Sequence, residues 1–296
     1  MSHNVALLNA AEQFFNYSRE RYQILLNRRA GKPREEWTND PVLQHWSFCN
    51  IFREDDRTTM WFKEHIRDPL HNSNAALMAT IAFRWFNRIN AGEVLKPFLL
   101  QNIWSQGRWR AALQARREVD GVIVTGAYMI KSPPGLSKID GLLRCIWQAK
   151  EQEEELIRAV NGNNLEGAWD AIRGCAYMGD FTSYEVVTDL CHTMMLKYAN
   201  DKLIWANPGP GCAAGLGALF YQNRGKFDRH NTGDRAVMME LMRQLLAYSQ
   251  DKNYWPEDWP EWELREVEHT LCEWDKYRRA QQGLRLKRKY NANCST

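Results

Sequence analysis

The chain has 296 residues, of which 44% are hydrophobic and 25% charged, so its composition is that of an ordinary globular protein. The formal net charge of +3 is too small to establish nucleic-acid binding by itself, although a local basic patch matters more than the sum. No run approaches the roughly 18 apolar residues of a membrane helix, so we expect no membrane partner.

Seven cysteines are scattered along the chain, and no two of them form a Cys-x-x-Cys pair. The sequence therefore predicts neither a zinc site nor a redox dithiol, and we expect no metal and no other cofactor. The odd number of cysteines and the absence of a secretory signal indicate a reduced, cytoplasmic setting. Thirteen tryptophans and eleven tyrosines are many, and such rings fill a core or stack on extruded bases.

Residues 5–30 predict a first helix, because apolar side chains such as Phe15 and Leu25 recur near one face. The arginines of this helix, Arg21 among them, fall mostly on other faces. The Gly-Lys-Pro sequence that follows ends the helix, and residues 37–41 predict a turn with a cap for the next helix.

Residues 53–57 place two arginines around three carboxylates. On a helix, Arg53 and Arg57 would share one face and could clamp a phosphate with their guanidinium groups. The carboxylates of Asp55 and Asp56 lie between them in the sequence. The alternative is a ladder of salt bridges on a solvated face, which is the commoner fate of such runs.

Helical periodicity predicts further helices at about 75–90, 92–116, 142–160 and 165–173. The β-branched run at 122–130 interrupts this rhythm and predicts a short strand or an extended loop. Lys138 follows in the next loop and could meet a substrate phosphate, although an ordinary surface lysine is the more common case.

Two glycine-rich turns precede helices, at 174–180 and at 207–211. In the first turn we expect Gly174 to close a helix and Gly179 to take a positive φ. Asp180 is expected to cap the next helix through its side chain. Backbone N–H groups at such helix starts attract anions, above all phosphates. The alternative is that both are ordinary turns between helices.

The last predicted helix, at about 263–279, carries an apolar stripe that indicates a docked helix. Four polar or reactive residues lie on the adjacent face, namely Glu268, Cys272, Asp275 and Arg279. They form either a satisfied network between helices or a catalytic cluster.

No internal repeat and no linker divides the chain. We therefore predict one helical domain, 1–280, followed by a basic and then polar tail, 281–296, that is disordered. Long helical periodicities and few alternating runs predict a mainly α fold with at most a small strand element.

Five segments together resemble the helical DNA-base-hypermodification proteins of bacteriophages. These segments are 37–43, 48–57, 178–190, 207–211 and 267–277. The group includes the helical domain of hydroxymethyluracil DNA kinases and the glutamyl/putrescinyl-thymine pyrophosphorylases, also called amino acid:DNA transferases. The resemblance extends over about 20–280 and implies a helix-hairpin-helix fold like that of base-excision DNA glycosylases.

The kinase activity of relatives with an added P-loop domain is not expected, because the sequence contains no Gly-x-x-x-x-Gly-Lys-Ser/Thr motif. The resemblance then implies the transferase reaction. Hydroxymethyluracil in DNA, phosphorylated or pyrophosphorylated by a separate base kinase, would exchange that group for an amine from an amino acid or a polyamine. The target base must be flipped out of the duplex or met in a single strand. For a phage protein the setting would be the host cytoplasm.

Such a reaction needs a base for the incoming ammonium group and positive charge for the leaving phosphate. The catalytic candidates are Asp55, Asp56, Glu268, His269 and Cys272. The candidates for substrate binding are Arg53, Arg57, Lys138, Tyr184, Glu185, Asp189, Asn207, Glu273, Asp275 and Lys276. The candidates for DNA binding are Gly179, Thr182, Gly209 and Gly211. Cys49 or Cys272 could also add covalently to the uracil ring.

Two other functions stay open on the sequence alone. One is a non-catalytic helix-hairpin-helix module that brings a partner enzyme to DNA, and the other is a base-excising DNA glycosylase. The polar residues at 53–57 and 268–276 favour chemistry over binding alone. We hypothesise that these two segments face one pocket, with the turn at 207–211 as a third wall.

Overall fold

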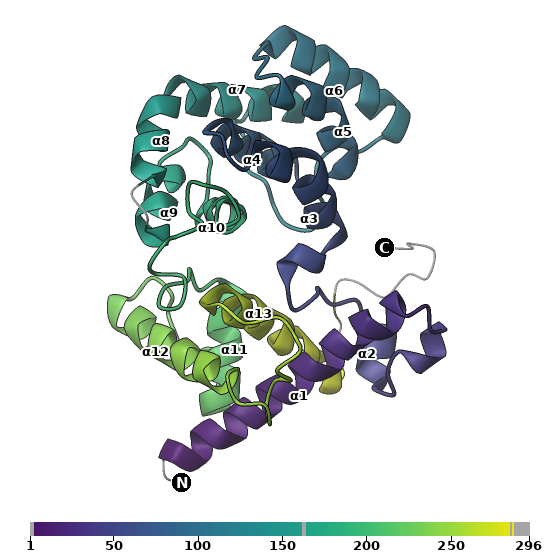
Figure 1. The fold of residues 1–296 in the computed structure, drawn as a ribbon, viewed down its shortest axis with the longest axis vertical. Helices are drawn as coiled ribbons and strands as arrows, with labels where there is room; N and C mark the ends of the chain where they lie inside the picture. The colour runs from purple at the N-terminus through teal and green to yellow at the C-terminus, as the bar shows by residue number, and fades with distance from the viewer. Residues whose placement is uncertain (1–2, 162–163, 285, 287–296) are drawn as a thin grey trace. The chain divides into compact units, whose positions relative to one another are not determined.

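The structure is a computed structural model that describes residues 3–161, 164–284 and 286. Over these ranges the regular elements are α-helices with short 3-10 and π-helical turns, and none of the described residues forms a strand (Figure 1). The predicted mainly α fold is confirmed, and the run at 122–130 is an irregular loop. The helix-hairpin-helix arrangement stays a prediction.

The chain divides into two compact units. Unit 1 consists of residues 1–56 and 202–296, and unit 2 consists of residues 57–201. The sequence shows no linker at either boundary and predicts one domain over 1–280, whereas the structure divides these residues between two units. Most of the predicted disordered tail, residues 285 and 287–296, lies outside the described residues.

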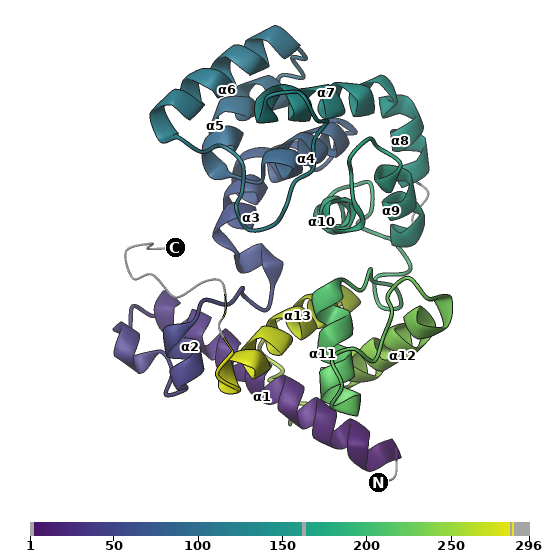
Figure 2. The ribbon, with the colours of Figure 1, turned by 180° about the vertical axis from the view of Figure 1, so that it is seen from behind.

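Unit 1 is built from helices at both ends of the chain. Its elements are α1 (His3–Arg29), η1 (Arg34–Glu36), α2 (Pro41–His45), η2 (Arg53–Asp55), α11 (Pro210–Tyr221), α12 (Thr232–Tyr248) and α13 (Leu264–Gln281). α13 packs against α11, α12, α1 and α2, as the two opposite views of Figures 1 and 2 show. The last helix of the chain is therefore the centre of a unit that also contains the first.

Local sequence signals set the ends of two of these helices. Asp40 caps α2, because its Oδ1 accepts hydrogen bonds from the backbone N–H groups of Val42 (2.7 Å) and Leu43 (3.1 Å). The cap that residues 37–41 predict is thus confirmed. α13 begins with a capping box in which Glu263 and Glu266 each accept from the other's backbone N–H.

Aromatic rings fill much of the core of unit 1. Phe14 on α1 lies 5.7 Å from the ring of Trp262, and Trp255 lies 5.1 Å from Trp262, both in edge-to-face geometry. Each of these three side chains is buried. Trp255 and Trp262, on either side of an exposed turn at 257–258, therefore belong to the core, which accounts for part of the high tryptophan content.

Glycines allow the backbone of α11 to approach α13 closely. A Cβ atom on Gly215 would lie 2.4 Å from the carbonyl oxygen of Leu271, and one on Gly211 would lie 2.2 Å from the Sγ of Cys272. No L-residue with a side chain fits such spaces without moving a helix. The small residues after the turn at 207–211 therefore fix how α11 sits on α13.

We expect Gly215→Ala to destabilise unit 1 by about 2 kcal/mol, because the new methyl group meets backbone that cannot turn aside. Gly107→Ala on α6 (Gln106–Asp120) is the matched control, since no atom lies within 4 Å of its added Cβ. There alanine should be neutral or stabilise by up to about 1 kcal/mol. Urea unfolding followed by circular dichroism measures both, and equal midpoints would contradict the close approach.

Unit 2 is a set of helices arranged around α4. Its elements are α3 (Arg57–Phe62), η3 (Lys63–Arg67, a π-helical turn), η4 (Asp68–Leu70), α4 (Ala75–Phe86), α5 (Ile89–Leu100), α6, α7 (Lys138–Glu151), α8 (Glu153–Val160), α9 (Leu165–Arg173) and α10 (Asp180–Leu190). α4 is buried from Ala76 to Phe86 and packs against α5, α7 and α10. An apolar helix in this position organises the unit from its centre.

Three predicted helix boundaries need correction. The helix predicted at 75–90 ends at Phe86, because Asn87 takes a left-handed conformation with φ 44°. The helix predicted at 92–116 is two helices, α5 and α6, separated by residues 101–105. The helix predicted at 142–160 is likewise divided into α7 and α8 at Gln152.

The turn before α10 also differs from the prediction. Gly174 is the C-terminal cap of α9 as expected, but Gly179 has φ −92° and is not left-handed. Tyr177 takes the positive φ of 63°, so the chain reverses two residues earlier. Asp180 is the first residue of α10, so Gly179 and not Asp180 occupies the N-cap position; the carboxylate of Asp180 lies 3.7 Å from Nη1 of Arg173.

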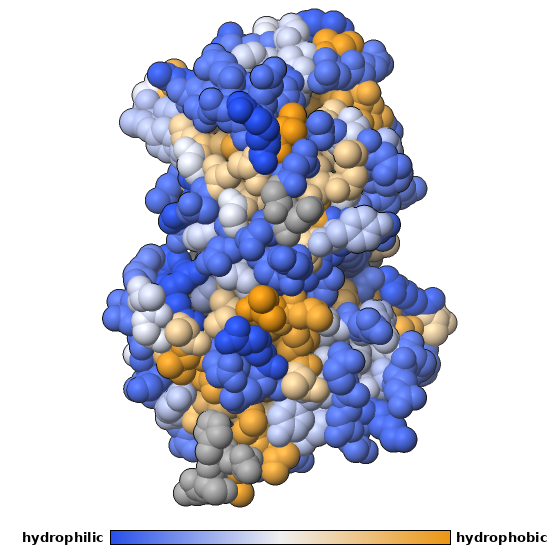
Figure 3. Space-filling view, turned by 60° about the vertical axis from the view of Figure 1, so that its left-hand side comes forward, coloured by the Kyte–Doolittle hydropathy of each residue, from blue (hydrophilic) through white to orange (hydrophobic). Residues whose placement is uncertain are grey.

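Polar residues cover most of the face drawn in Figure 3, with smaller apolar areas between them. Large apolar side chains that are exposed include Leu203, Ile204 and Val237 in unit 1 and Val119 and Met129 in unit 2. Within the described residues, no helix combines the length and the hydropathy needed to cross a bilayer.

Candidate functional site

A group of polar side chains gathers where the segment 49–56 meets α13 in unit 1. Its members, called the α13 cluster below, are Cys49, Asn50, Asp56, His269, Glu273 and Lys276. The first three come from the loop around η2, and the last three follow one another along one side of the helix. Residues more than 200 positions apart in the sequence therefore meet at one place.

Glu273 is the buried anion of the α13 cluster. Its Oε2 accepts from the backbone N–H of Cys49 (3.1 Å), and its Oε1 accepts from Nζ of Lys276. Burial opposes the ionisation of Glu273, but the charges of Lys276 and His269 and these hydrogen bonds outweigh it and lower the pKa of the carboxyl. Burial lowers the pKa of Lys276, but the charge of Glu273 has the larger effect and the pKa is raised overall, so the pair is ionised.

Asn50 holds the loop of the α13 cluster in one conformation. Its backbone N–H and its Nδ2 both donate to Oδ1 of Asp56, each at 3.1 Å. Its carbonyl accepts from Nε2 of His269 at 3.1 Å, since a carbonyl can only accept. Burial raises the pKa of Asp56, although His269 and the Asn50 N–H act in the opposite direction.

α1 contributes a buried arginine that the sequence places on another face. Arg21 is 6% exposed and donates from Nε to the Cys49 carbonyl (3.0 Å) and from Nη2 to Oδ1 of Asn50 (2.7 Å). Its Nη1 is buried and forms no hydrogen bond, and the same holds for the hydroxyl of Tyr17. Arg21 lies four residues after Tyr17 and four before Leu25, both buried, and this spacing is the signal that could have identified it.

The turn at 207–211 lies against α13, close to the α13 cluster. The backbone N–H of Gly209 donates to Oε1 of Glu268 at 2.9 Å, and α11 begins at the next residue. Gly211 faces Cys272, which lies one turn after Glu268. Burial, followed by the charge of Glu273, raises the pKa of Cys272 to about 12. Unit 1 thus brings together two of the segments of the hypothesised pocket, 268–276 on α13 and the turn at 207–211.

Asp275 has a different environment, although the sequence groups it with these residues. Arg224 binds it with two hydrogen bonds, Nε to Oδ1 at 2.6 Å and Nη2 to Oδ2 at 2.8 Å. The carboxylate is buried, while the arginine remains half exposed. This geometry favours a role in attaching the loop after α11 to α13.

Residues 53–57 do not form the single helix on which the predicted arginine clamp was based. The 3-10 turn η2 ends at Asp55, Asp56 is extended with ψ 132°, and α3 begins at Arg57. Arg53 and Arg57 therefore do not share a helix face, and they belong to different units. Asp55 pairs with Nη2 of Arg29 at 2.7 Å near the surface, which favours the structural alternative for this carboxylate.

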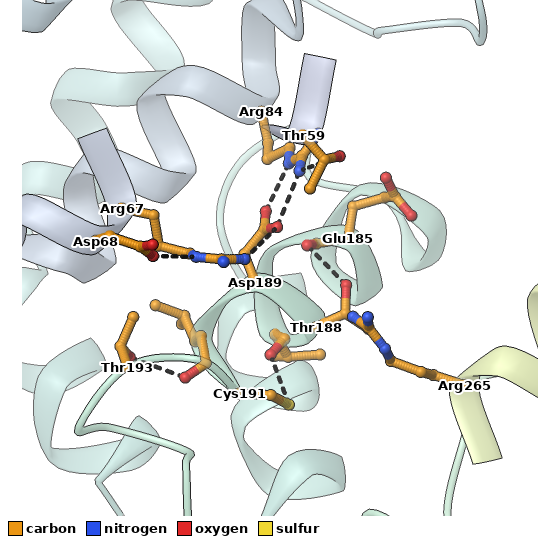
Figure 4. A network of polar contacts seen from close by, with 12 residues as sticks. Thr59, Arg67, Asp68, Arg84, Glu185, Thr188, Asp189, Cys191, Thr193 and Arg265 are labelled. Atoms are coloured by element: carbon orange, nitrogen blue, oxygen red, sulfur yellow. Dashed lines mark hydrogen bonds and ion pairs between the residues drawn. The ribbon is translucent and has the colours of Figure 1, made fainter. Parts of the chain in front are cut away.

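Unit 2 contains a second polar network, around Asp189 on α10 (Figure 4). Nε of Arg84 donates to its Oδ2 at 2.6 Å and Nη2 donates to its Oδ1 at 2.9 Å, while Nη1 of Arg67 lies 4.0 Å from Oδ1. All three side chains are about 1% to 2% exposed. Burial disfavours the charge on Arg84, but Asp189 outweighs it, so the pKa of the guanidinium is raised.

This network changes the interpretation of Asp189, which the sequence predicts as a substrate-binding residue. Both carboxylate oxygens are engaged by Arg84 in a buried place, and this favours a structural role. The sequence analysis missed Arg84, although a single arginine inside the apolar helix α4 is a signal of a buried ion pair.

The remaining predicted residues lie in unit 2 or beside the turn of unit 1. Lys138 donates from Nζ to the Ile130 carbonyl and to Oγ of Ser132 (3.3 Å), so it holds the preceding loop. Tyr184 and Thr182 on α10 are buried, whereas Glu185 is half-buried. Gly179 accepts from the backbone N–H and from Oγ of Ser183, each at 3.0 Å. Asn207 is buried in unit 1.

Comparisons with known proteins point to phage DNA modification. The family profile described as "5-hmdU DNA kinase, helical domain" matches residues 8–285. A protein named 5-hmdU DNA kinase from Bacillus phage SP10 is 26% identical, with 87% of this chain and 43% of the phage protein covered. The chain thus spans less than half the length of this curated relative. No solved structure matches the chain.

Proposed function

The chain belongs to the family of the 5-hmdU DNA kinase helical domain, and we propose that it is a transferase of thymine hypermodification in phage DNA. Its substrate is a hydroxymethyluracil base in DNA that a separate kinase has phosphorylated or pyrophosphorylated. The transferase replaces that group by an amine from an amino acid or a polyamine.

One observation carries this proposal: titratable groups of α13 meet two separate segments of unit 1. His269 and Glu273 contact the segment 49–56, and Glu268 contacts the turn at 207–211. Burying such groups costs free energy that a packed apolar interface would not require. Glu268 and His269 nevertheless remain half-buried and are not sealed in the core, so the arrangement supports a reaction site.

The proposed reaction forms a C–N bond at the exocyclic methylene carbon as the C–O bond to the phosphate breaks. The ammonium group of the donor must first lose a proton, and Glu268 is the proposed acceptor. The phosphate leaves with the electron pair of the C–O bond and needs positive charge beside it. In unit 1, Lys276 is the proposed source of that charge, although it also pairs with Glu273.

Covalent help from a cysteine is not part of the proposal. The pKa of Cys272 is about 12, and burial, followed by the charge of Glu273, raises the pKa of Cys49 well above its ordinary value. Both thiols are therefore protonated near neutral pH, and a thiol is a far weaker nucleophile than a thiolate.

The test is incubation of the protein with DNA that contains phosphorylated or pyrophosphorylated hydroxymethyluracil, together with a panel of amino acids and polyamines. We expect nucleoside mass spectrometry to show the amine in place of the phosphate, with an equal amount of phosphate or pyrophosphate released. A free modified base would instead indicate a glycosylase. Tight DNA binding without any product across the panel would indicate a binding module.

A further inference from the structure

We propose that Cys49, Asp56 and His269 form a binding site for a divalent transition-metal ion of the zinc type. The thiol sulfur, a carboxylate oxygen and an imidazole nitrogen lie within 4.8 Å of one another. Ligands of a four-coordinate zinc ion are about 3.5 Å apart, since the bonds to nitrogen and oxygen are about 2.0–2.2 Å and those to sulfur about 2.3 Å. An ion would therefore draw the three atoms together by at most about 1.3 Å.

The chemistry of the three ligands selects the class of ion. A thiolate and an imidazole favour zinc and its neighbours in the first transition series over magnesium and calcium, which prefer oxygen ligands. Three protein ligands leave the fourth position of a tetrahedral ion for water or substrate, as in catalytic zinc sites. All three side chains are half-buried, so an ion can enter from solvent.

The surroundings hold the ligands in place before any ion binds. Asn50 donates two hydrogen bonds to Asp56, and its carbonyl orients the imidazole of His269. Glu273 accepts from the backbone N–H of Cys49. Such outer contacts fix ring and carboxylate orientation and typically contribute tenfold or more to metal affinity.

The local charge also favours a cation. A Cys49 thiolate with the carboxylates of Asp56 and Glu273 gives three negative charges. The charged groups that face them are Arg21 from α1 and Lys276 from α13, which give two positive charges. These five groups together carry one negative charge, so a divalent ion is attracted. Loss of the thiol proton accompanies binding, because the thiolate is the ligand.

The site has a use that rests on the proposed function. A bound ion could take a phosphate oxygen of the leaving group at its fourth coordination position and would stabilise the charge that develops there. Such an ion would place positive charge beside the phosphate within unit 1 itself. Metal binding itself can be measured without DNA, so the two proposals can fail separately.

The experiment is titration of the reduced full-length protein with Co²⁺ alone, in the absence of DNA. We expect one ion per chain, visible tetrahedral absorption bands and a sulfur-to-cobalt charge-transfer band. Zn²⁺ should displace the cobalt and abolish these bands. Cys49→Ser should remove the charge-transfer band, while Asp56→Asn and His269→Ala should weaken binding at least about tenfold.

Cys272→Ser is the matched control, because Cys272 is close in the same unit but is not among the three ligands. It should retain the charge-transfer band at full intensity. Far-ultraviolet circular dichroism confirms that each variant folds. Absence of stoichiometric binding to the folded wild-type protein, or a charge-transfer band that survives in Cys49→Ser, would overturn the proposal.

Discussion

Glu268→Gln should slow amine transfer about 100-fold or more while leaving the fold and DNA binding intact. Glutamine keeps an oxygen that can accept from the Gly209 N–H, so the contact between α13 and the turn at 207–211 is preserved. It cannot take up the proton that the incoming ammonium group must lose. The loss should therefore appear in the rate of the chemical step rather than in substrate affinity.

Single-turnover transfer assays, in which the DNA concentration exceeds the dissociation constant of the protein–DNA complex, measure this rate directly. Glu261→Gln is the matched control, since this exposed glutamate lies just before α13 and makes the same change in charge. It should transfer at the wild-type rate. If Glu268→Gln retained more than about a third of the activity, Glu268 would not be the base, and its role would be confined to holding the Gly209 turn.

Local features of the fold were accessible from the sequence. The cap at Asp40, the helix closure at Gly174 and the glycine turn before α11 follow from short-range rules, and the structure shows each of them. The break inside 142–160 was not accessible, because it falls at Gln152 with no glycine or proline at the break itself. The break inside 92–116 has a local signal that the prediction missed, since Asn102 takes a left-handed conformation with φ 52°.

The α13 cluster shows the limit of pattern reading for a site. Glu268 and His269 could be selected from a helix with an apolar stripe, but their partners lie far away in the sequence: Gly209 is 59 residues before Glu268, and Asn50 is 219 residues before His269. The sequence excluded a metal because no Cys-x-x-Cys pair exists, whereas the proposed ligands come from positions 49, 56 and 269. Only tertiary packing of α1, α13 and the loop around η2 brings such ligands together.

Buried arginines were missed for a related reason. Arg21 and Arg84 both lie within predicted helices and are buried, but the sequence placed Arg21 mostly away from the apolar face and gave Arg84 no role. An arginine can be buried when carbonyls or a carboxylate meet its planar group, and both cases occur here. An arginine that falls at the spacing of an apolar stripe therefore indicates a buried structural network, even though its charge alone suggests an exposed side chain.

Asp189→Ala should destabilise unit 2 by about 3–5 kcal/mol, which is the usual cost of removing one partner of a buried ion pair. Arg84 would keep its bonds to Thr59 and Asn87 but lose the carboxylate that balances its charge. Arg67, 4.0 Å from the same carboxylate, would lose part of its neutralisation as well. Asp189→Asn keeps the shape of the side chain and should still destabilise, because the two arginine charges stay unbalanced.

Asp170→Asn provides the comparison within the same unit. Its pair with Arg173 is exposed, with 65% and 44% of the two side chains accessible, so its loss should cost no more than about 1 kcal/mol. Urea unfolding gives the three free energies, and hydrogen exchange of α4 and α10 locates the effect in unit 2. If both Asp189 variants unfolded like Asp170→Asn, the carboxylate would not stabilise unit 2. The sequence-based role of Asp189 in substrate binding would then become the better interpretation, to be tested in the transfer assay.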